Sequence, residues 1–184
     1  MMGIEAGYDC RTTLAEIEGN FPSGAALIPI VPRLKKPSVA DWPGIRASDL
    51  QKPEFRALFV GETGIGMVCG QASKGLCFVD VDRDNLVEAV ESASPELAGT
   101  VRIRGARGAK WLVRVEAPVR GFLLRDADGK RVGEFLGERQ QGLLAGIHPV
   151  SGNPYQRLWR RQVPVVDPLQ IGDLFKPLSP FSHD

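Results

Sequence analysis

The chain has few of the residues that build metal clusters and cross-links. Its 184 residues include three cysteines and two histidines. Cys10, Cys69 and Cys77 form no Cys-x-x-Cys pair, and His148 and His183 lie far from them in sequence. We therefore expect no structural zinc site, because its closely spaced ligand pairs are missing. Reduced thiols that pack as small hydrophobic side chains are the expected state of the cysteines.

The sequence also lacks long apolar runs and an excess of either charge. Its longest apolar runs, such as residues 25–31, fall far short of the roughly 18 residues of a membrane-spanning helix. The first fifteen residues carry neither a basic leader nor a continuous apolar segment, so we expect no membrane partner and, by default, a cytoplasmic location. The 23 basic and 22 acidic residues nearly cancel. Any case for a nucleic-acid partner must therefore come from local clusters of charge.

What is present is typical of one soluble globular domain, with 43% hydrophobic and 24% charged residues. Thr13 and Glu16 have the spacing of a capping box, so they predict a short first helix with Leu14 and Ile17 facing the core. Residues 24–31 predict a buried strand that Pro29 confines to a sheet edge or to a bulge. Residues 32–44 follow as an extended surface loop that carries cations and prolines.

Strands dominate the rest of the chain. Residues 64–70 and 76–82 predict one hairpin, and residues 100–104 and 109–115 predict a second. Between them lies a helix over residues 86–92, for which Asp84 and Asn85 are good N-caps. Strands over 131–136 and 142–147 follow, and Asp167 opens a short helix that ends at Phe175. The class is α+β with a mainly antiparallel sheet. We divide this single domain into an N-terminal α/β portion (1–62), a catalytic sheet portion (63–162) and a proline-rich tail (163–184).

Residues 78–82 (FVDVD) carry two carboxylates at the end of a predicted strand. Because side chains alternate along a strand, Asp80 and Asp82 project to the same side, with Cα atoms about 6.6 Å apart. Two adjacent carboxylates repel each other unless a cation lies between them, so a divalent metal is the economical explanation. Mg²⁺ or Mn²⁺ held there would keep coordination positions for water and substrate phosphates.

Two other interpretations of this segment stay open. The acids can be a polar strand end followed by a helix cap, with no ligand. Alternatively, Asp80, Asp82, Asp84 and Glu91 fall at positions 1, 3, 5 and 12 of a calcium-loop pattern. Against that pattern, Asn85 stands where the loop requires glycine, and the preceding glycines disfavour an entering helix.

The second predicted hairpin is rich in cations. Apolar and basic residues alternate along both of its strands, so we expect one apolar face and one cationic face that carries Arg102, Arg104, Lys110 and Arg114. Arg107 lies at the turn. This density of charge suits the phosphates of a triphosphate or of a nucleic acid, although a solvated, salt-bridged face is the alternative. Carboxylates and cations on neighbouring strands are what a nucleotide site with a bridging metal needs.

Two further candidates come later in the chain. Glu134 shares a strand face with Val132 and Leu136, so it can complete a three-carboxylate cluster with Asp80 and Asp82. Glu138 is a competing acid, more typical of a turn. His148 lies in a loop dense in turn residues (146–155), where it is either a nucleotide ligand or a histidine whose hydrogen bonds are satisfied within the loop.

Taken together, these segments resemble the bifunctional primase-polymerase domain of the archaeo-eukaryotic primase superfamily. The likeness runs over about residues 24–160 and depends on the order of its motifs. ALIPIV (26–31) with Lys35, Lys36 and Trp42 is similar to the opening of the family, and GIGMVCG (64–70) to its glycine-rich hairpin. FVDVD (78–82) is similar to its paired-acid metal motif, and GARGAKWL (105–112) to its second motif. GEFL (133–136) and HPVSG (148–152) with Tyr155 resemble its third acid and closing loop.

The resemblance implies a sheet like that of an RNA-recognition motif, packed with a smaller α/β portion, and two-metal nucleotidyl transfer on a DNA template. Carried onto this chain, it makes Asp80, Asp82 and Glu134 metal ligands. Nucleoside triphosphates would be held by Lys36, Arg107, Lys110 and His148, and a DNA template and primer by Arg102, Arg104 and Arg114. The tail can then be a docking segment or a linker to a replicative helicase.

Lys110 departs from the family pattern, because it stands where the family has a nucleotide-binding histidine. Lysine keeps a cation for phosphate but loses the planar imidazole that titrates near neutral pH. The expected function is therefore a DNA-templated nucleotidyltransferase. The alternative is a degenerate relative that binds nucleotide or single-stranded DNA without chemistry.

Overall fold

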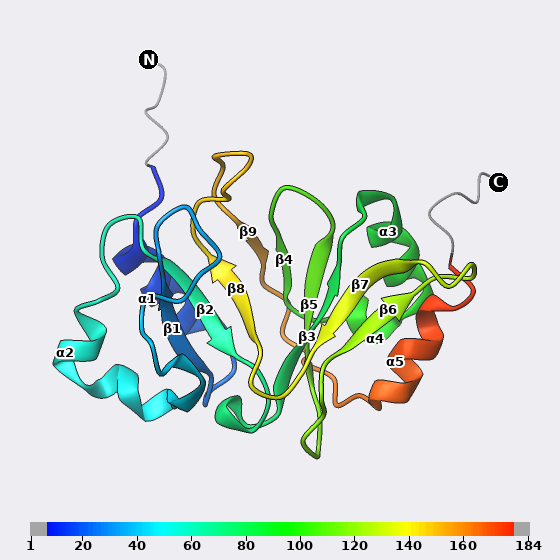
Figure 1. The fold of residues 1–184 in the computed structure, drawn as a ribbon, viewed down its shortest axis with the longest axis horizontal. Helices are drawn as coiled ribbons and strands as arrows, with labels where there is room; N and C mark the ends of the chain where they lie inside the picture. Colours follow the sequence, from blue (N-terminus) through cyan, green and yellow to red (C-terminus); the bar gives the residue numbers. More distant parts are fainter. Residues whose placement is uncertain (1–6, 179–184) are drawn as a thin grey trace.

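The computed structural model describes residues 7–178, which form an α+β fold with two antiparallel sheets side by side (Figure 1). The smaller sheet has the order β1-β2-β8 and the larger the order β6-β7-β3-β5-β4-β9. The predicted α+β class with mainly antiparallel pairing is confirmed. The smaller sheet consists of β1 (Ala26–Ile30), β2 (Gly64–Val68) and β8 (Gln141–Ala145). The larger consists of β3 (Leu76–Val81), β4 (Arg102–Arg104), β5 (Ala109–Arg114), β6 (Phe122–Arg125), β7 (Arg131–Leu136) and β9 (Gln156–Leu158).

The helices are short. They are α1 (Cys10–Asn20), α2 (Pro53–Arg56), α3 (Asp84–Ala93), α4 (Pro95–Ala98) and α5 (Pro168–Phe175), with 3-10 turns η1 (Trp42–Gly44), η2 (Ala47–Gln51) and η3 (Gln71–Ser73). Helices α3, α4 and α5 lie beside the larger sheet, whereas α1 and α2 belong to the side of the smaller one (Figure 1). Within residues 7–178, no helix has the length and apolar character needed to cross a membrane.

The first helix begins earlier than its sequence pattern predicts. Asp9 is the N-cap, and its side chain accepts a hydrogen bond from the Thr12 amide at 2.9 Å. Thr13 is therefore an interior, buried residue of α1, and its assignment as the cap was wrong. The inward-facing residues were predicted correctly, because Leu14 and Ile17 are both buried. The spacing between Thr13 and Glu16 is equally compatible with two positions one turn apart inside a helix, so it could not fix the start.

The predicted first hairpin is also wrong. Strands β2 and β3 follow one another in the chain but belong to different sheets, and only an isolated bridge between Gly70 and Leu76 joins them. The reason is burial, since β2 and most of β3 are buried on both faces. Each is an interior strand with two neighbours: β2 pairs with β1 and β8, and β3 with β5 and β7. Both β2 and β8 thus fall within residues 63–162 but belong to the same sheet as β1 of the N-terminal portion, which pairs with β2.

Part of the core lies between the two sheets. Phe78 of β3 faces the smaller sheet, where Gly142 of β8 approaches it so closely that a Cβ at position 142 would lie 2.5 Å from the Phe78 ring. The other face of the larger sheet carries Val79, Trp111 and Phe135, which stand opposite one another on β3, β5 and β7. Trp111 donates a hydrogen bond to Glu91 of α3 at 2.9 Å, which places the helices on this face.

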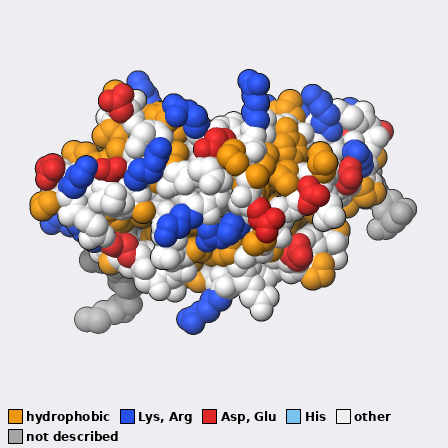
Figure 2. Space-filling model, turned by 90° about the horizontal axis from the view of Figure 1, so that it is seen from below, with side chains coloured by type: hydrophobic (Ala, Val, Ile, Leu, Met, Phe, Trp, Pro, Cys, Tyr) orange, Lys and Arg blue, Asp and Glu red, His pale blue; other side chains and the backbone are white. Residues whose placement is uncertain are grey.

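Several other predictions are confirmed. Strand β1, which contains Pro29, is at the edge of its sheet, where a missing amide donor costs no ladder bond. Asp167 caps α5 by accepting from the Leu169 amide at 2.9 Å. The three cysteines are buried and free. The surface seen from below carries interspersed basic and acidic side chains (Figure 2), in keeping with the nearly balanced composition.

The segment after β3 is not a calcium loop. Residues 84–93 are helical, so most of the twelve positions that such a loop requires belong to α3. The predicted N-caps are also corrected, because Arg83 is the N-cap of α3 and Asp84 is its first residue. The Asp84 carboxylate is turned away from a capping role, as described below.

Candidate functional site

Three adjacent strands of the larger sheet bring an acid, a base and a second acid into one row. In the register of the sheet, Asp80 of β3 is directly opposite Lys110 of β5 on one side and Glu134 of β7 on the other. Residues directly opposite in antiparallel strands project from the same face. Asp82 follows the end of β3, two residues beyond Asp80, and its amide donates to the Val132 carbonyl at 2.9 Å. The predicted side-by-side placement of Asp80 and Asp82 agrees with this backbone, because the extended pairing continues as far as Asp82.

Asp80 and Asp82 line a pocket of about 170 Å³ between the two sheets. Its walls carry two carboxylates, several cations, an aromatic ring and a histidine. The lining residues are Lys35, Asp80, Asp82, Ile103, Gly105, Ala106, Arg107, Ala109, Lys110, Leu136, Gln141, Leu143, His148 and Tyr155. Of the predicted site residues, Asp80, Asp82, Arg107, Lys110 and His148 therefore meet in one place, although they span 69 positions of sequence. We call this the Asp80 pocket.

Lys110 holds a cation inside this pocket. Its Nζ donates to the Leu143 carbonyl at 3.2 Å and lies 5.8 and 5.9 Å from the ring centroids of Phe78 and Tyr155. Within residues 7–178, no carboxylate oxygen lies within 4.0 Å of this Nζ. Burial lowers the pKa of Lys110, and the neighbouring Asp80 opposes that change. An ammonium with one donor engaged has donors left for an anionic ligand.

Asp80 shows the reverse shift. Burial raises the pKa of this carboxyl, Lys110 opposes the rise, and the negative charges of Asp82 and Glu134 add to it. A carboxylate that its surroundings destabilise gains more from a bound cation than a solvated one does. Asp82 is exposed at the mouth of the same pocket. Two carboxylates on one face offer the oxygen ligands that Mg²⁺ and Mn²⁺ prefer, with positions left for water and phosphate oxygens.

Arg107 reaches the pocket from the turn between β4 and β5. Gly108, with φ +62°, ends this turn, and a Cβ there would lie 1.7 Å from the Val81 carbonyl oxygen. The turn is tied to α3, because the Gly108 amide donates to Asp84 Oδ1 at 2.8 Å and Arg104 donates to the same oxygen at 3.1 Å. Asp84 thus fixes the turn that carries Arg107 instead of capping its own helix.

His148 is buried, and its ring nitrogen Nδ1 accepts from the amides of Val150 at 3.1 Å and Ser151 at 3.3 Å. A neutral ring whose Nδ1 accepts carries its proton on Nε2, so His148 retains one N–H donor. Burial lowers the pKa of His148, and the nearby cations Lys35, Arg107 and Lys110 lower it further. The loop therefore satisfies Nδ1, and the ring lines the pocket. A role of His148 as a nucleotide ligand stays a prediction.

Glu134 differs from the other two acids. Its Oε1 accepts from Gln140 Nε2 at 3.0 Å, and Arg131 lies 3.7 Å from Oε2. It is absent from the lining of the Asp80 pocket, and residues 7–178 contain no group of three His, Cys, Asp or Glu side chains arranged to hold a metal ion. The fit of a metal here thus rests on Asp80 and Asp82, with Glu134 one strand away. Glu138 accepts from the Gln71 amide at 2.9 Å, which is a turn contact.

The predicted cationic face is wrong in its membership. Arg102 stands opposite Trp111, and Ile103 stands opposite Lys110, so Arg102 and Arg104 point toward the helices and away from Lys110. Arg102 lies 3.0 Å from Glu91 of α3, and Arg104 lies 3.1 Å from Asp84. Arg114 shares the face of Lys110 but is at the other end of β5, where it donates to the Lys74 carbonyl. A role of these three arginines in DNA binding stays a prediction.

The loop of residues 32–44 contributes a lysine other than the predicted one. Lys36 is exposed and does not line the pocket, whereas its neighbour Lys35 does. Gln141 Nε2 donates to the Lys35 carbonyl at 3.1 Å and so fixes the loop against β8. Sequence reasoning singled out neither Lys35 nor Gln141 as a ligand. No local pattern joins two residues 106 positions apart.

No protein-family model matches the chain, and no curated protein matches it in sequence. The interpretation of the Asp80 pocket therefore stands on its own chemistry and on the resemblance of its motifs.

Proposed function

We propose that this protein is a DNA-templated nucleotidyltransferase of the primase-polymerase type, with the Asp80 pocket as its nucleoside-triphosphate site. One observation carries the proposal: Lys110, Asp80 and Glu134 stand in a row on three adjacent strands, with Asp82 two residues beyond. In the family that the motifs resemble, these positions hold the nucleotide ligand, the metal ligands and the third acid. An RNA-recognition-motif-like organisation of the larger sheet belongs to the same proposal.

In this mechanism, Asp80 and Asp82 would hold Mg²⁺ or Mn²⁺, with Glu134 as a further acid, and the metal would activate the 3′-hydroxyl and stabilise charge on the phosphates. Lys110, Arg107 and Lys35 surround the place where a triphosphate would lie, so they would hold it and stabilise the departing pyrophosphate. The reaction joins the 3′-oxygen to the α-phosphorus and breaks the bond between the α- and β-phosphates. The residues of the chain would contribute mainly by positioning the triphosphate and by stabilising the charge on its phosphates.

Primer extension tests this proposal. Purified protein would be given primed and unprimed DNA templates with dNTPs or NTPs and with Mg²⁺ or Mn²⁺. We expect metal-dependent incorporation that Asp80→Ala reduces by about 100-fold or more, since loss of an outer-shell partner alone costs about 10- to 100-fold. The matched control is Asp128→Ala, which removes an exposed acid at the turn after β6 and should retain activity. Equal incorporation by wild type and Asp80→Ala would refute the mechanism.

A second candidate is a relative that binds nucleotide or single-stranded DNA without chemistry. Two observations favour it: a lysine replaces the histidine of the resembled family, and the described part of the chain has no three-acid metal group. Lys110→His separates the two candidates. If the wild type binds dNTP but neither it nor Lys110→His extends a primer, the binding protein is the better description.

A further inference from the structure

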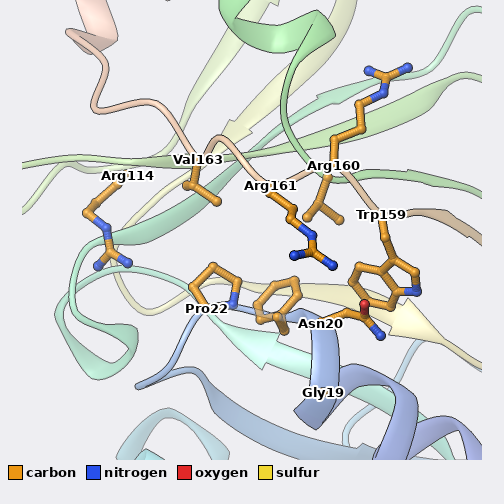
Figure 3. A pocket seen from close by; sticks show the side chains of 10 residues that line it. Gly19, Asn20, Pro22, Arg114, Trp159, Arg160, Arg161 and Val163 are labelled. Atoms are coloured by element: carbon orange, nitrogen blue, oxygen red, sulfur yellow. The ribbon is translucent and has the colours of Figure 1, made fainter.

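A second pocket, at the other end of the larger sheet, is lined by arginines and aromatic rings. It has a volume of about 450 Å³ and shares no lining residue with the Asp80 pocket. Its walls come from the end of α1 and the residues that follow it, from Val101 just before β4, from Arg114 at the end of β5, and from the segment after β9 (Figure 3). They comprise Gly19, Asn20, Phe21, Pro22, Val101, Arg114, Trp159, Arg160, Arg161 and Val163, with no Asp or Glu among them. We call this the Trp159 pocket.

Two of its three arginines carry charge that no acid within residues 7–178 neutralises. Arg161 is exposed, extends across the pocket toward Trp159 and Asn20 (Figure 3), and makes no hydrogen bond or ion pair with any residue in the range 7–178. Among the described residues, the Arg114 side chain donates only to the Lys74 carbonyl. Arg160 is different, since it points away from the pocket and pairs with Glu91 at 2.7 Å. The pocket therefore presents two guanidinium charges without a carboxylate partner in the described chain, which favours an anionic ligand.

Trp159 supplies a rigid aromatic surface beside these charges. Its indole nitrogen donates to Glu16 Oε1 at 2.7 Å, and its ring meets Phe21 edge-on with centroids 6.3 Å apart and planes at 78°. A ring held from two sides loses little conformational freedom when a ligand stacks on it. Aromatic side chains next to arginines are the usual platform for nucleobases and their phosphates.

We propose that the Trp159 pocket binds a nucleotide unit, with the nucleobase against Trp159 and the phosphate on Arg161 and Arg114. The volume lies within the roughly 300–1,000 Å³ typical of small-ligand sites. The pocket is a site separate from the Asp80 pocket, because Arg114 and Lys110 are four residues apart on β5, or about 13 Å. The unit can be a free nucleotide or part of a single strand, since both offer the same base and phosphate. The inference goes beyond the proposed nucleotidyl transfer and does not depend on it.

Binding measurements on matched variants test this site. The probes are dATP, titrated by calorimetry in EDTA, and a fluorescein-labelled dT₁₂ oligonucleotide, followed by fluorescence anisotropy. Arg161→Ala is the principal variant because this side chain is exposed, and Arg120→Ala is its control because it removes an exposed arginine outside both pockets. Trp159→Ala serves as a second variant, with circular dichroism to check its fold.

We expect Arg161→Ala to weaken binding of at least one probe by about tenfold or more, the usual loss for a charge-assisted hydrogen bond. Trp159→Ala should weaken the same probe by roughly 5- to 100-fold through lost stacking. Loss for dATP identifies a free-nucleotide site, and loss for dT₁₂ alone, with a salt slope reduced by about 0.7, identifies a strand site. Both results support the proposal, whether or not the wild type extends primers. Unchanged binding of both probes by Arg161→Ala, or an equal loss with Arg120→Ala, would overturn it.

Discussion

Burial disfavours the charged forms of both Asp80 and Lys110, and these opposite pKa shifts determine which ligands the Asp80 pocket favours. The pKa of Asp80 is raised and that of Lys110 is lowered, and each residue partly offsets the shift of the other. A divalent cation bound at Asp80 and a phosphate bound at Lys110 would each stabilise the charged form of its partner. The pocket is therefore poised to take a metal and an anion together.

The raised pKa of Asp80 predicts a pH dependence for metal binding. A protonated carboxyl binds metal poorly, so Mn²⁺ affinity should fall as the pH drops through the raised Asp80 pKa, above the ordinary aspartate value of about 3.9. Calorimetric titration with Mn²⁺ from about pH 4 to pH 7 would measure this, over the window just above that ordinary value. Asp80→Asn should bind weakly throughout, with little pH dependence. A variant with the same affinity and pH profile as the wild type would show that Asp80 is not the ligand.

For single residues, the sequence predicts the positions of the acidic side chains better than those of the basic ones. The alternation of side chains along a strand was enough to place Asp80 and Asp82 together, because both belong to one local segment. Lys35 was named only as part of a motif and Lys36 was chosen as the ligand, because the place of Lys35 in the pocket depends on a long-range contact with Gln141. Glu134 stands where the pattern put it, opposite Asp80, but its side chain contacts Gln140 and Arg131, which no strand pattern specifies.

Among the elements, the contact of β8 with β3 joins the two sheets and is sensitive to side-chain volume. Gly142→Ala should lower the free energy of unfolding by about 1–3 kcal/mol, the usual cost of overpacking a core. The reason is that its Cβ would lie 2.5 Å from the Phe78 ring. Urea denaturation would measure the change.

Gly19→Ala is the matched control. Gly19 is within the last turn of α1, and no atom lies within 4 Å of the position its Cβ would take. Alanine there should leave stability unchanged or raise it by up to about 1 kcal/mol, since alanine is the better helix former. Equal destabilisation by the two substitutions would mean that the close sheet packing at Gly142 has no special role.

The errors in strand pairing come from the register and from the choice of partner strand. Apolar and basic residues do alternate along β4 and β5, as the pattern predicts. Because Ile103 stands opposite Lys110, however, the arginines of β4 and Lys110 of β5 point to opposite faces. Register depends on the geometry of the turn and on which face is buried, and alternation within each strand does not determine it. The same limit applies to β2 and β3, whose partners are remote in sequence.

For the whole molecule, the order of strands ties the two sheets into one folding unit. The chain enters the smaller sheet with β1 and β2, crosses to the larger for β3 to β7, returns with β8 and crosses again to β9. A fragment of residues 63–184 would keep β2 and β8 but lose β1 and α1, and so would expose the buried faces of the smaller sheet.

We therefore predict a single cooperative unfolding transition for the intact chain and no cooperative transition for the 63–184 fragment. Urea titrations followed by tryptophan fluorescence and by far-ultraviolet circular dichroism would test both, with coincident curves expected for the intact chain. A fragment that unfolds cooperatively would instead support an independent catalytic sheet portion.

The α+β class follows from strand and helix patterns alone, whereas the division into two sheets does not. Segments with turn residues between them look like hairpins whether or not their strands pair. Burial on both faces, which separates β2 from β3, is a property of the assembled fold. The two pockets lie at opposite ends of one face of the larger sheet, and their positions are likewise a property of the assembled fold. The sequence pattern indicated only the Asp80 pocket.

The most direct test of the central claim is a crystal soaked with a dNTP and Mn²⁺, with anomalous diffraction recorded to locate the manganese. The account predicts an anomalous peak between the carboxylates of Asp80 and Asp82, with the triphosphate beside Lys35, Arg107 and Lys110. Manganese and triphosphate bound elsewhere, or a Lys110 ammonium that occupies the metal position while the nucleotide is excluded, would contradict it.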